Sequence, residues 1–194
     1  MQAGQRVLVH GISGGVGTAL AQLGHLSGLE MYGTASAHKH AFVRSLNVTP
    51  IDYRHDDFVA RIAEWTHDGV DLAIDPIGGD NWRRSYRSLR KGGRLILSGI
   101  QSLADKPAVA LLPYALQMLF LAIRPDGKSI RFVGLIPEKQ PDAYREDLTQ
   151  LVTYLAQGKI NPIINRTFPL SAAAEAHRYL ENGEASGKLV LIPD

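Results

Sequence analysis

Residues 6–17, RVLVHGISGGVG, decide the fold of this chain. Val7, Leu8 and Val9 form a short apolar run typical of a buried parallel strand, and residues 18–26 carry apolar side chains at helical spacing. The glycines between the two segments therefore lie in a turn that joins a strand to a helix. We expect the rest of the fold to be built outward from this strand, turn and helix.

The glycine-rich turn has the composition of a phosphate-binding loop. Gly14 has no side chain to block a pyrophosphate, Gly17 lets the helix lie close to the strand, and the first N–H groups of the helix face negative charge. The common six-residue fingerprint has glycine where this chain has Ile12, so the pattern is a variant. A tight turn without a ligand is the alternative, and the strand and helix around the loop favour dinucleotide binding.

The composition excludes several classes of function. The chain has 194 residues and a net charge of +2, from 21 basic and 19 acidic residues without a basic run that would follow a nucleic-acid backbone. It has no cysteine, which excludes disulfides, thiolate zinc sites and cysteine nucleophiles, and its seven histidines form no HExxH spacing. We therefore predict no metal site and no nucleic-acid partner. The polar amino terminus has no signal-peptide core, so we expect a cytoplasmic protein.

The longest apolar stretch, residues 107–123, contains Pro113 and is too short for a comfortable membrane span. It predicts a buried or interfacial helix, and because that helix lacks a polar face we expect a partner subunit to cover it.

Strand-like and helical segments alternate through the first two thirds of the chain. This alternation predicts an α/β fold with a doubly wound, six-stranded parallel sheet, covered by helices on both faces. The expected strands are residues 7–9, 30–35, 50–53, 70–75, 94–99 and 130–136, and the expected helices are residues 18–26, 39–46, 57–65 and 82–89.

The pattern changes after this alternation. Helices are expected over residues 144–157 and 171–181, and the strand-like segments 163–168 and 189–192 would have no obvious partner in a finished parallel sheet. We therefore divide the chain into a dinucleotide-binding domain, residues 1–141, and a segment that contributes to a second domain, residues 142–194.

The end of the second strand discriminates between the two nicotinamide cofactors. An acidic residue there would accept hydrogen bonds from a free ribose 2′-hydroxyl, whereas this chain has Ser36 and Lys39. A hydroxyl and a cation at this place favour the 2′-phosphate of NADP(H). The alternative is that Ser36 caps the next helix and Lys39 is a solvated residue of its first turn.

With these residues identified, the chain resembles the zinc-independent, zeta-crystallin-like quinone oxidoreductase branch of the medium-chain dehydrogenase/reductase superfamily. Polyketide synthase enoyl reductase domains share this ancestry and remain an alternative. The resemblance covers nearly the whole chain and is carried by VLVHGISGGVG, GTASAHKH, PIDYR, GVDLAIDPIGG, LRKGGRLILSGI, NPIINRTFPL and GKLVLIP.

The resemblance implies a Rossmann fold and a set of cofactor-binding positions. In the family, these positions lie along the pyrophosphate, around the 2′-phosphate, beside the fourth strand and near the nicotinamide. Tyr53 is also consistent with simple packing at a strand end, and Lys188 with an ordinary surface lysine. The residues that match are Ser13, Gly14, Gly15 and Val16; Ser36, Lys39 and Tyr53; Asp75 and Ile77; Ser98, Gly99, Ile100 and Phe132; and Lys188 at the pyrophosphate.

The resemblance also implies what the chain does and what it needs. Members of the family hold NADPH against an electron-poor quinone or enone, and the cofactor carries the chemistry. They have an amino-terminal GroES-like domain that this chain does not contain, so we expect a fragment, an excised domain or a reduced member. They also pair as homodimers through the strand at residues 132–136. A non-catalytic NADP(H)-binding module, like the vesicle amine transport protein homologues, is the alternative function, and the sequence assigns no catalytic residue.

Overall fold

The computed structural model describes residues 1–99, 101, 112–133 and 140–194. β1 (Arg6–His10) is the central strand, and it is followed by the glycine loop and by α1 (Gly15–Leu26). Side chains alternate across β1 because the strand repeat is two residues. Val7 and Val9 face one cluster of buried residues, whereas Leu8 belongs to the cluster on the opposite face. Both faces of β1 are therefore buried, as its continuous apolar sequence predicts.

Six parallel strands form the main sheet, in the order β3, β2, β1, β4, β5, β6. Strand order reverses direction between β1 and β4, which is the topological switch point of a doubly wound fold. The predicted fold class is confirmed. Besides β1, the strands are β2 (Glu30–Ala35), β3 (Val48–Asp52), β4 (Val70–Asp75), β5 (Leu89–Leu97) and β6 (Ser129–Phe132).

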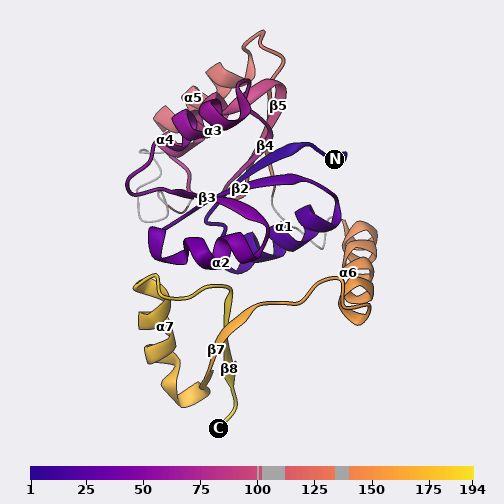
Figure 1. Ribbon diagram of the computed structural model, residues 1–194, viewed down its shortest axis with the longest axis vertical. Coiled ribbons are helices and arrows are strands. Elements are labelled where there is room, and N and C mark those ends of the chain that lie inside the picture. Colours follow the sequence, from indigo (N-terminus) through magenta and orange to yellow (C-terminus); the bar gives the residue numbers. More distant parts are fainter. Residues whose placement is uncertain (100, 102–111, 134–139) are drawn as a thin grey trace.

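Helices cover the two faces of the sheet (Figure 1). α1 and α2 (His40–Ser45) pack on one face, with Ala21 and Val43 against Val7 and Val9. The other face carries α3, α4 and α5, which bury Phe58, Ile62, Trp82, Tyr86 and Leu121 against the sheet. These helices are α3 (Phe58–Thr66), α4 (Asp80–Arg87) and α5 (Leu112–Ala122).

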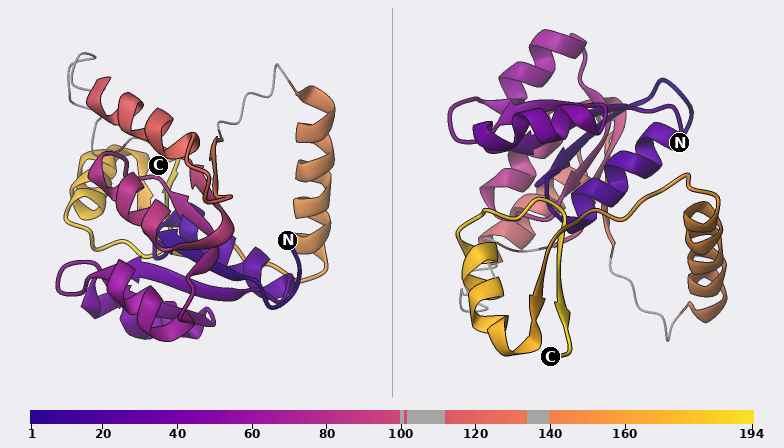
Figure 2. Two further views of the ribbon diagram at one scale, coloured as in Figure 1. Left: turned by 90° about the horizontal axis from the view of Figure 1, so that it is seen from above. Right: turned by 60° about the horizontal axis from the view of Figure 1, so that its bottom comes forward.

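The carboxyl-terminal segment forms a separate layer below the main sheet (Figures 1 and 2). β7 (Ile164–Pro169) and β8 (Lys188–Ile192) pair with each other in parallel, so each of these two strands finds its partner in the other. α7 (Ala173–Glu181) connects them, and α6 (Pro141–Ala156) stands apart on the other side of the segment.

Hydrogen bonds attach this segment to the glycine loop and to α1. The Gly187 amide donates to the Ser13 carbonyl at 2.8 Å, and Gly14 and Gly187 form an isolated parallel bridge. The Gln22 side chain also exchanges two hydrogen bonds with the backbone of Asn161, at 2.9 and 2.6 Å. The carboxyl-terminal segment thus contacts the glycine loop and helps to fix its position.

Several element boundaries differ from the sequence prediction. Residues 39–46 do not form one helix: a 3₁₀ turn, Ala37–Lys39, precedes α2. The third strand begins at Val48 and ends at Asp52, so Tyr53 lies outside it. The helix expected at residues 171–181 likewise begins as a 3₁₀ turn, Leu170–Ala172. The expected ends of the sixth strand, at residues 134–136, and of the apolar helix, at 107–111, lie outside the described residues.

The apolar helix α5 is covered on one side only. Leu121 is buried, whereas Leu112, Leu116, Leu119 and Phe120 are exposed. α6 has no buried residue, and Leu148, Leu151, Val152 and Leu155 along it are exposed. Within the described residues, no helix is both long enough and apolar enough to cross a membrane.

Candidate functional site

A cleft of about 710 Å³ lies at the carboxyl ends of β1, β2, β3 and β4. This is the place where open parallel sheets bind their ligands, because the strand order switches there. Its lining comes from the glycine loop, the ends of β2 and β3, α3, α4 and the segment around α7. The lining residues are His10, Gly11, Ser13, Gly14, Thr34, Ala35, Ser36, Lys39, Tyr53, Arg54, Phe58, Ile77, Asn81, Arg84, Gln101, Leu180, Gly183 and Ala185.

The glycine loop brings the amino terminus of α1 to the edge of this cleft. Gly14 is the N-cap residue and has no side chain to occupy the first N–H groups of the helix, which leaves them free to bind an anion. A Cβ on Gly17 would stand 2.5 Å from the Ile12 Cα, so only glycine lets the helix lie this close to the loop. Val16, in the first turn, is 68% exposed.

Ser36 and Lys39 lie together in the cleft wall, as the sequence predicts for residues near a 2′-phosphate. Both are buried, and the Lys39 ammonium donates a hydrogen bond to the Ala185 carbonyl. Burial lowers the pKa of Lys39 below its ordinary value. The alternative of a solvated lysine is therefore wrong. Ser36 is at the N-cap of the 3₁₀ turn, but its side chain makes no capping hydrogen bond.

Tyr53 and Arg54 form the rim of the cleft beyond β3. Tyr53 is 55% exposed, so the alternative of a tyrosine packed at a strand end is wrong. The Arg54 guanidinium lies 5.7 Å from the centroid of the Tyr53 ring. Asp52 accepts hydrogen bonds from the His55 ring and the Arg54 amide, and these bonds, the one from His55 first, lower the pKa of Asp52. These bonds fix the conformation of the loop that follows β3.

The opposite wall contains residues that sequence reasoning missed. The Arg84 guanidinium lies 4.4 Å from the centroid of the Phe58 ring and pairs with Asp57 at 3.0 Å. Asn81 lines the same wall. The signal that could have found them is the helical spacing of residues 81 and 84 on a helix that begins at a glycine pair after β4.

Asp75 does not line the cleft, although Ile77 does. The Asp75 side chain is fully buried and accepts hydrogen bonds from the amides of Ile77 and Gly78, at 2.8 and 3.2 Å. Its place is therefore behind the loop that borders the cleft, which it holds in shape.

The remaining predicted residues are distributed around the cleft rather than gathered in it. Ser98 donates its amide to the Asp75 carbonyl, and Gly99 packs against Pro76. Phe132 is 69% exposed on β6 and is not among the residues that line the cleft. Ile100 lies outside the described residues. His10, one of the seven histidines to which the sequence assigns no site, lines the cleft floor, where burial lowers its pKa to about 4.

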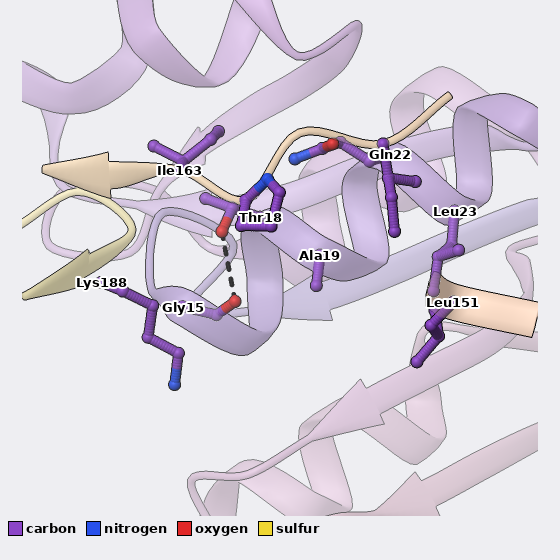
Figure 3. Close-up of a pocket in the computed structure, with 10 residues that line it drawn as sticks. Gly15, Thr18, Ala19, Gln22, Leu23, Leu151, Ile163 and Lys188 are labelled. Carbon is purple, nitrogen blue, oxygen red and sulfur yellow. Dashed lines mark hydrogen bonds between the residues drawn. The ribbon is translucent and has the colours of Figure 1, made fainter. Parts of the chain in front are cut away.

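Lys188 and Gly15 border a second, smaller cavity of about 190 Å³ (Figure 3). The Lys188 side chain lies across Gly15 at the first turn of α1. Leu23 from α1 and Leu151 from α6 form the far end of this cavity, which is largely apolar. Lys188 therefore reaches the same helix terminus that the glycine loop presents to the main cleft.

No group of three or more histidine, aspartate or glutamate side chains is placed to bind a metal ion within the part of the chain that the structure describes. The lining of the main cleft, as far as it is described, holds Lys39, Arg54 and Arg84 and no carboxylate. A cleft with this charge fits a ligand that carries several negative charges, and its volume fits a cofactor or other small molecule.

The fold and the cleft define a dinucleotide-binding domain of the dehydrogenase class. Residues 48–191 match the family described as zinc-binding dehydrogenase, so the chain belongs to this family. It is the cofactor-binding domain of the medium-chain dehydrogenase/reductase superfamily, and the resemblance seen in the sequence motifs is confirmed.

Curated relatives share the full length of this chain but are longer themselves. The synaptic vesicle membrane protein VAT-1 homolog of Mus musculus is 30% identical over 206 residues, which cover 100% of this chain and 50% of that protein. The spectinabilin polyketide synthase system protein NorB of Streptomyces orinoci is 30% identical over 98% of this chain and 8% of its own length. The chain thus spans about half the length of the vesicle-protein relative and a small part of the synthase protein.

Solved structures with the same fold include reductases. The CurK enoyl reductase has a TM-score of 0.81 and 27% identity, over 100% of this chain and 56% of its own. The quinone oxidoreductase from Coxiella burnetii has a TM-score of 0.74 and 30% identity, over 98% and 53%. A mycobacterial protein solved as a complex with NADPH has a TM-score of 0.79 and 25% identity, over 100% and 58%.

Proposed function

We propose that this chain is the NADP(H)-binding part of an oxidoreductase that transfers hydride between NADPH and an electron-poor quinone or enone. The observation that carries the proposal is the cleft at the switch point, whose described lining holds three cations and no carboxylate. A dinucleotide with a 2′-phosphate is more negatively charged than one without it, so this lining favours NADP(H) over NAD(H). The similarity to a protein solved with NADPH supports the same cofactor.

Different groups of residues bind different parts of the cofactor. Ser13, Gly14, Gly15 and Val16 lie along the pyrophosphate, with Lys188 as a second source of positive charge there. Ser36, Lys39 and Tyr53 surround the 2′-phosphate, and Arg54 adds a fourth group at the same rim. NADPH supplies the hydride, and the residues of this chain bind and orient the cofactor.

Lys39 has a hydrogen-bond partner within the chain that a bound 2′-phosphate can replace. Its ammonium donates to the Ala185 carbonyl, a neutral acceptor. A phosphate is a better acceptor for an ammonium, because its negative charge adds a Coulombic attraction that a carbonyl does not supply. We expect Lys39 to exchange the carbonyl for the phosphate when the cofactor binds.

The test is a titration of the purified chain with NADPH and with NADH, followed by nucleotide fluorescence. Native protein should bind NADPH more tightly than NADH. Lys39→Ala should weaken NADPH binding by about ten-fold and leave NADH binding nearly unchanged, because it removes one charged partner of the phosphate. Lys91→Ala is the matched control, since Lys91 is an exposed lysine on β5 outside the cleft. Equal affinities for the two nucleotides in the native chain would contradict the proposed cofactor.

An enoyl reductase domain is the second candidate, favoured by the similarity to the CurK enoyl reductase. The discriminating assay measures oxidation of NADPH by the chain with a quinone and, separately, with a 2-enoyl thioester. Turnover with the quinone supports the first proposal, and turnover with the thioester supports the second. A non-catalytic binding module is the remaining alternative, as the similarity to the VAT-1 homolog allows, and only turnover excludes it, because this chain spans about half the length of that relative.

We also propose that the parent protein has a GroES-like domain and forms a homodimer. β6 is the edge strand of the main sheet, and Phe132 and Val133 at its end are exposed apolar residues. Such an edge is suited to pair with its own copy. Sedimentation equilibrium should give a dimer mass, and Phe132→Glu should shift the equilibrium to the monomer. A monomer mass at every concentration would contradict the homodimer. A cytoplasmic location stays a prediction.

A further inference from the structure

Four polar side chains lie in contact in and beneath the floor of the cleft, and each of them is buried. They come from four different elements: β2, β1, α4 and β4. The His10 Nδ1 lies 3.1 Å from the Thr34 Oγ1, and the His10 Nε2 lies 2.9 Å from the Ser85 Oγ. The Ser85 Oγ in turn lies 2.6 Å from the Asp75 Oδ2. The contacts form one unbroken line from Thr34 to Asp75.

The position of each hydrogen along this line follows from the partners of Asp75. Its carboxylate is also approached by the Ile77 amide, the Gly78 amide and the Asn81 side-chain amide, all of which only donate. With Ser85 these groups make four, which is the number of acceptor sites on a carboxylate. The Ser85 hydroxyl therefore donates its hydrogen bond to Asp75, and the Ser85 oxygen accepts a hydrogen bond from His10.

This assignment settles the tautomer of His10. The Nε2 atom carries the hydrogen that Ser85 accepts, so in the neutral ring Nδ1 is an acceptor and takes the Thr34 hydroxyl hydrogen. The Thr34 oxygen accepts in its turn from the Gly11 amide, at 3.2 Å. Every hydrogen bond from Gly11 to Asp75 is thus donated in the same direction.

We propose that His10 is a positioning residue: as the neutral Nε2–H tautomer, it joins the glycine loop to the loop that follows β4 through one continuous chain of hydrogen bonds ending on Asp75. Gly11 and Ile77, at the two ends of this chain of hydrogen bonds, both line the cleft. The chain of hydrogen bonds therefore sets the separation of the two loops. This inference rests on the proposed cofactor function for its binding measurement.

The surroundings of His10 agree with a neutral ring. The edge of its ring meets Phe58, with centroids 4.6 Å apart and planes at 72°. Burial, the largest cause, and the charge of Arg84 lower the pKa of His10, and the charge of Asp75 acts in the opposite direction. A protonated ring would have a second N–H that points at Thr34 and would reverse the donor order on that side.

The test compares two serine variants on the same helix segment. Ser85→Ala removes a link of the chain, whereas Ser88→Ala removes a buried hydroxyl that donates to the Ser85 carbonyl and lies outside the chain. The tautomer of His10 is determined from long-range hydrogen–nitrogen spectra of its ring, assigned with His10→Asn. Amide exchange of Ile77 and Gly78 and the affinity for NADPH are measured alongside.

The native ring should remain a neutral Nε2–H tautomer from about pH 7 to about pH 5. Ser85→Ala should change the tautomer signal, speed amide exchange at Ile77 and Gly78, and weaken NADPH binding about ten-fold, and Ser88→Ala should change none of these. An Nδ1–H ring in the native chain, or equal behaviour of the two variants, would overturn the inference. If the native chain does not bind NADPH, the proposed function fails, and the spectra and exchange rates still decide the inference.

Discussion

Gly33 in β2 lies directly against the side chain of Ile12, the residue that replaces a glycine of the common fingerprint. A Cβ on Gly33 would stand 2.5 Å from the Ile12 Cβ, closer than two such atoms approach in proteins. Ile12 is fully buried and belongs to the core cluster beneath α1. The variant glycine loop is therefore accommodated because the neighbouring strand has no side chain at the point of contact.

Gly33→Ala should destabilise the protein by roughly 1–3 kcal/mol, because the new methyl group overpacks a closed part of the core. The clash is with the branched Cβ of Ile12, which has no freedom to move aside. Urea unfolding should show a lower midpoint with an unchanged slope. Ile12→Gly, which removes that Cβ, supplies the control: in that background Gly33→Ala should cost clearly less, and equal costs in the two backgrounds would show that the contact has no effect.

Two glycines of the α1 turn should differ sharply when changed to alanine. A Cβ on Gly17 meets the Ile12 and Gly11 backbone at 2.5 and 2.6 Å, and backbone cannot yield. A Cβ on Gly15 meets only the flexible end of Lys188. Gly17→Ala should therefore cost more than about 2 kcal/mol, and Gly15→Ala should change stability by less than about 1 kcal/mol. Thermal unfolding of both variants measures the difference, and similar losses would contradict the geometry.

Stability should depend on the protonation of His10. Its pKa is lowered from 6.5 to about 4 in the folded chain, chiefly by burial. Between these two pH values the unfolded chain binds a proton that the folded chain does not, so stability falls as the pH is lowered from 6.5 to 4 and is fully present above 6.5. The loss amounts to about 3 kcal/mol. Denaturant unfolding at several pH values measures it, and a His10→Asn variant should show a flatter profile over this range.

Tyr86 should contribute to the attachment of α5 and the turn after it. Its hydroxyl lies 3.0 Å from the Leu121 carbonyl and 2.9 Å from a carboxylate oxygen of Asp126, and burial raises its pKa to about 12. Tyr86→Phe should lower stability by about 1–2 kcal/mol, because a charged acceptor loses its donor. Tyr154→Phe, on exposed α6, is the control, and urea midpoints compare the two. Equal midpoints would show that the hydroxyl contributes nothing.

The sequence predicts the ends of two central strands and the residues that follow them better than it predicts the other parts of the site. The sequence predicts β2 and β4 with the bounds that the structure has, because their apolar runs end at Ala35 and Asp75 with clear changes of composition. Ser36 and Lys39 line the cleft, since the end of β2 leads into it by topology, and their place at a 2′-phosphate stays a prediction. Phe132 was expected near the cofactor from the resemblance alone, and it is exposed on an edge strand outside the cleft lining.

The sequence by itself determined the parallel sheet, the glycine turn and the family, because these depend on local patterns: the alternation of strand-like and helical segments, the glycines of residues 11–17 and short motifs along nearly the whole chain. Only the tertiary structure decided which distant residues meet. Arg84 reaches Phe58, His10 reaches Thr34 and Ser85, and β7 pairs with β8, and these contacts join elements far apart in the chain. Such contacts arise from packing and from the pairing of buried polar groups, which local sequence does not encode.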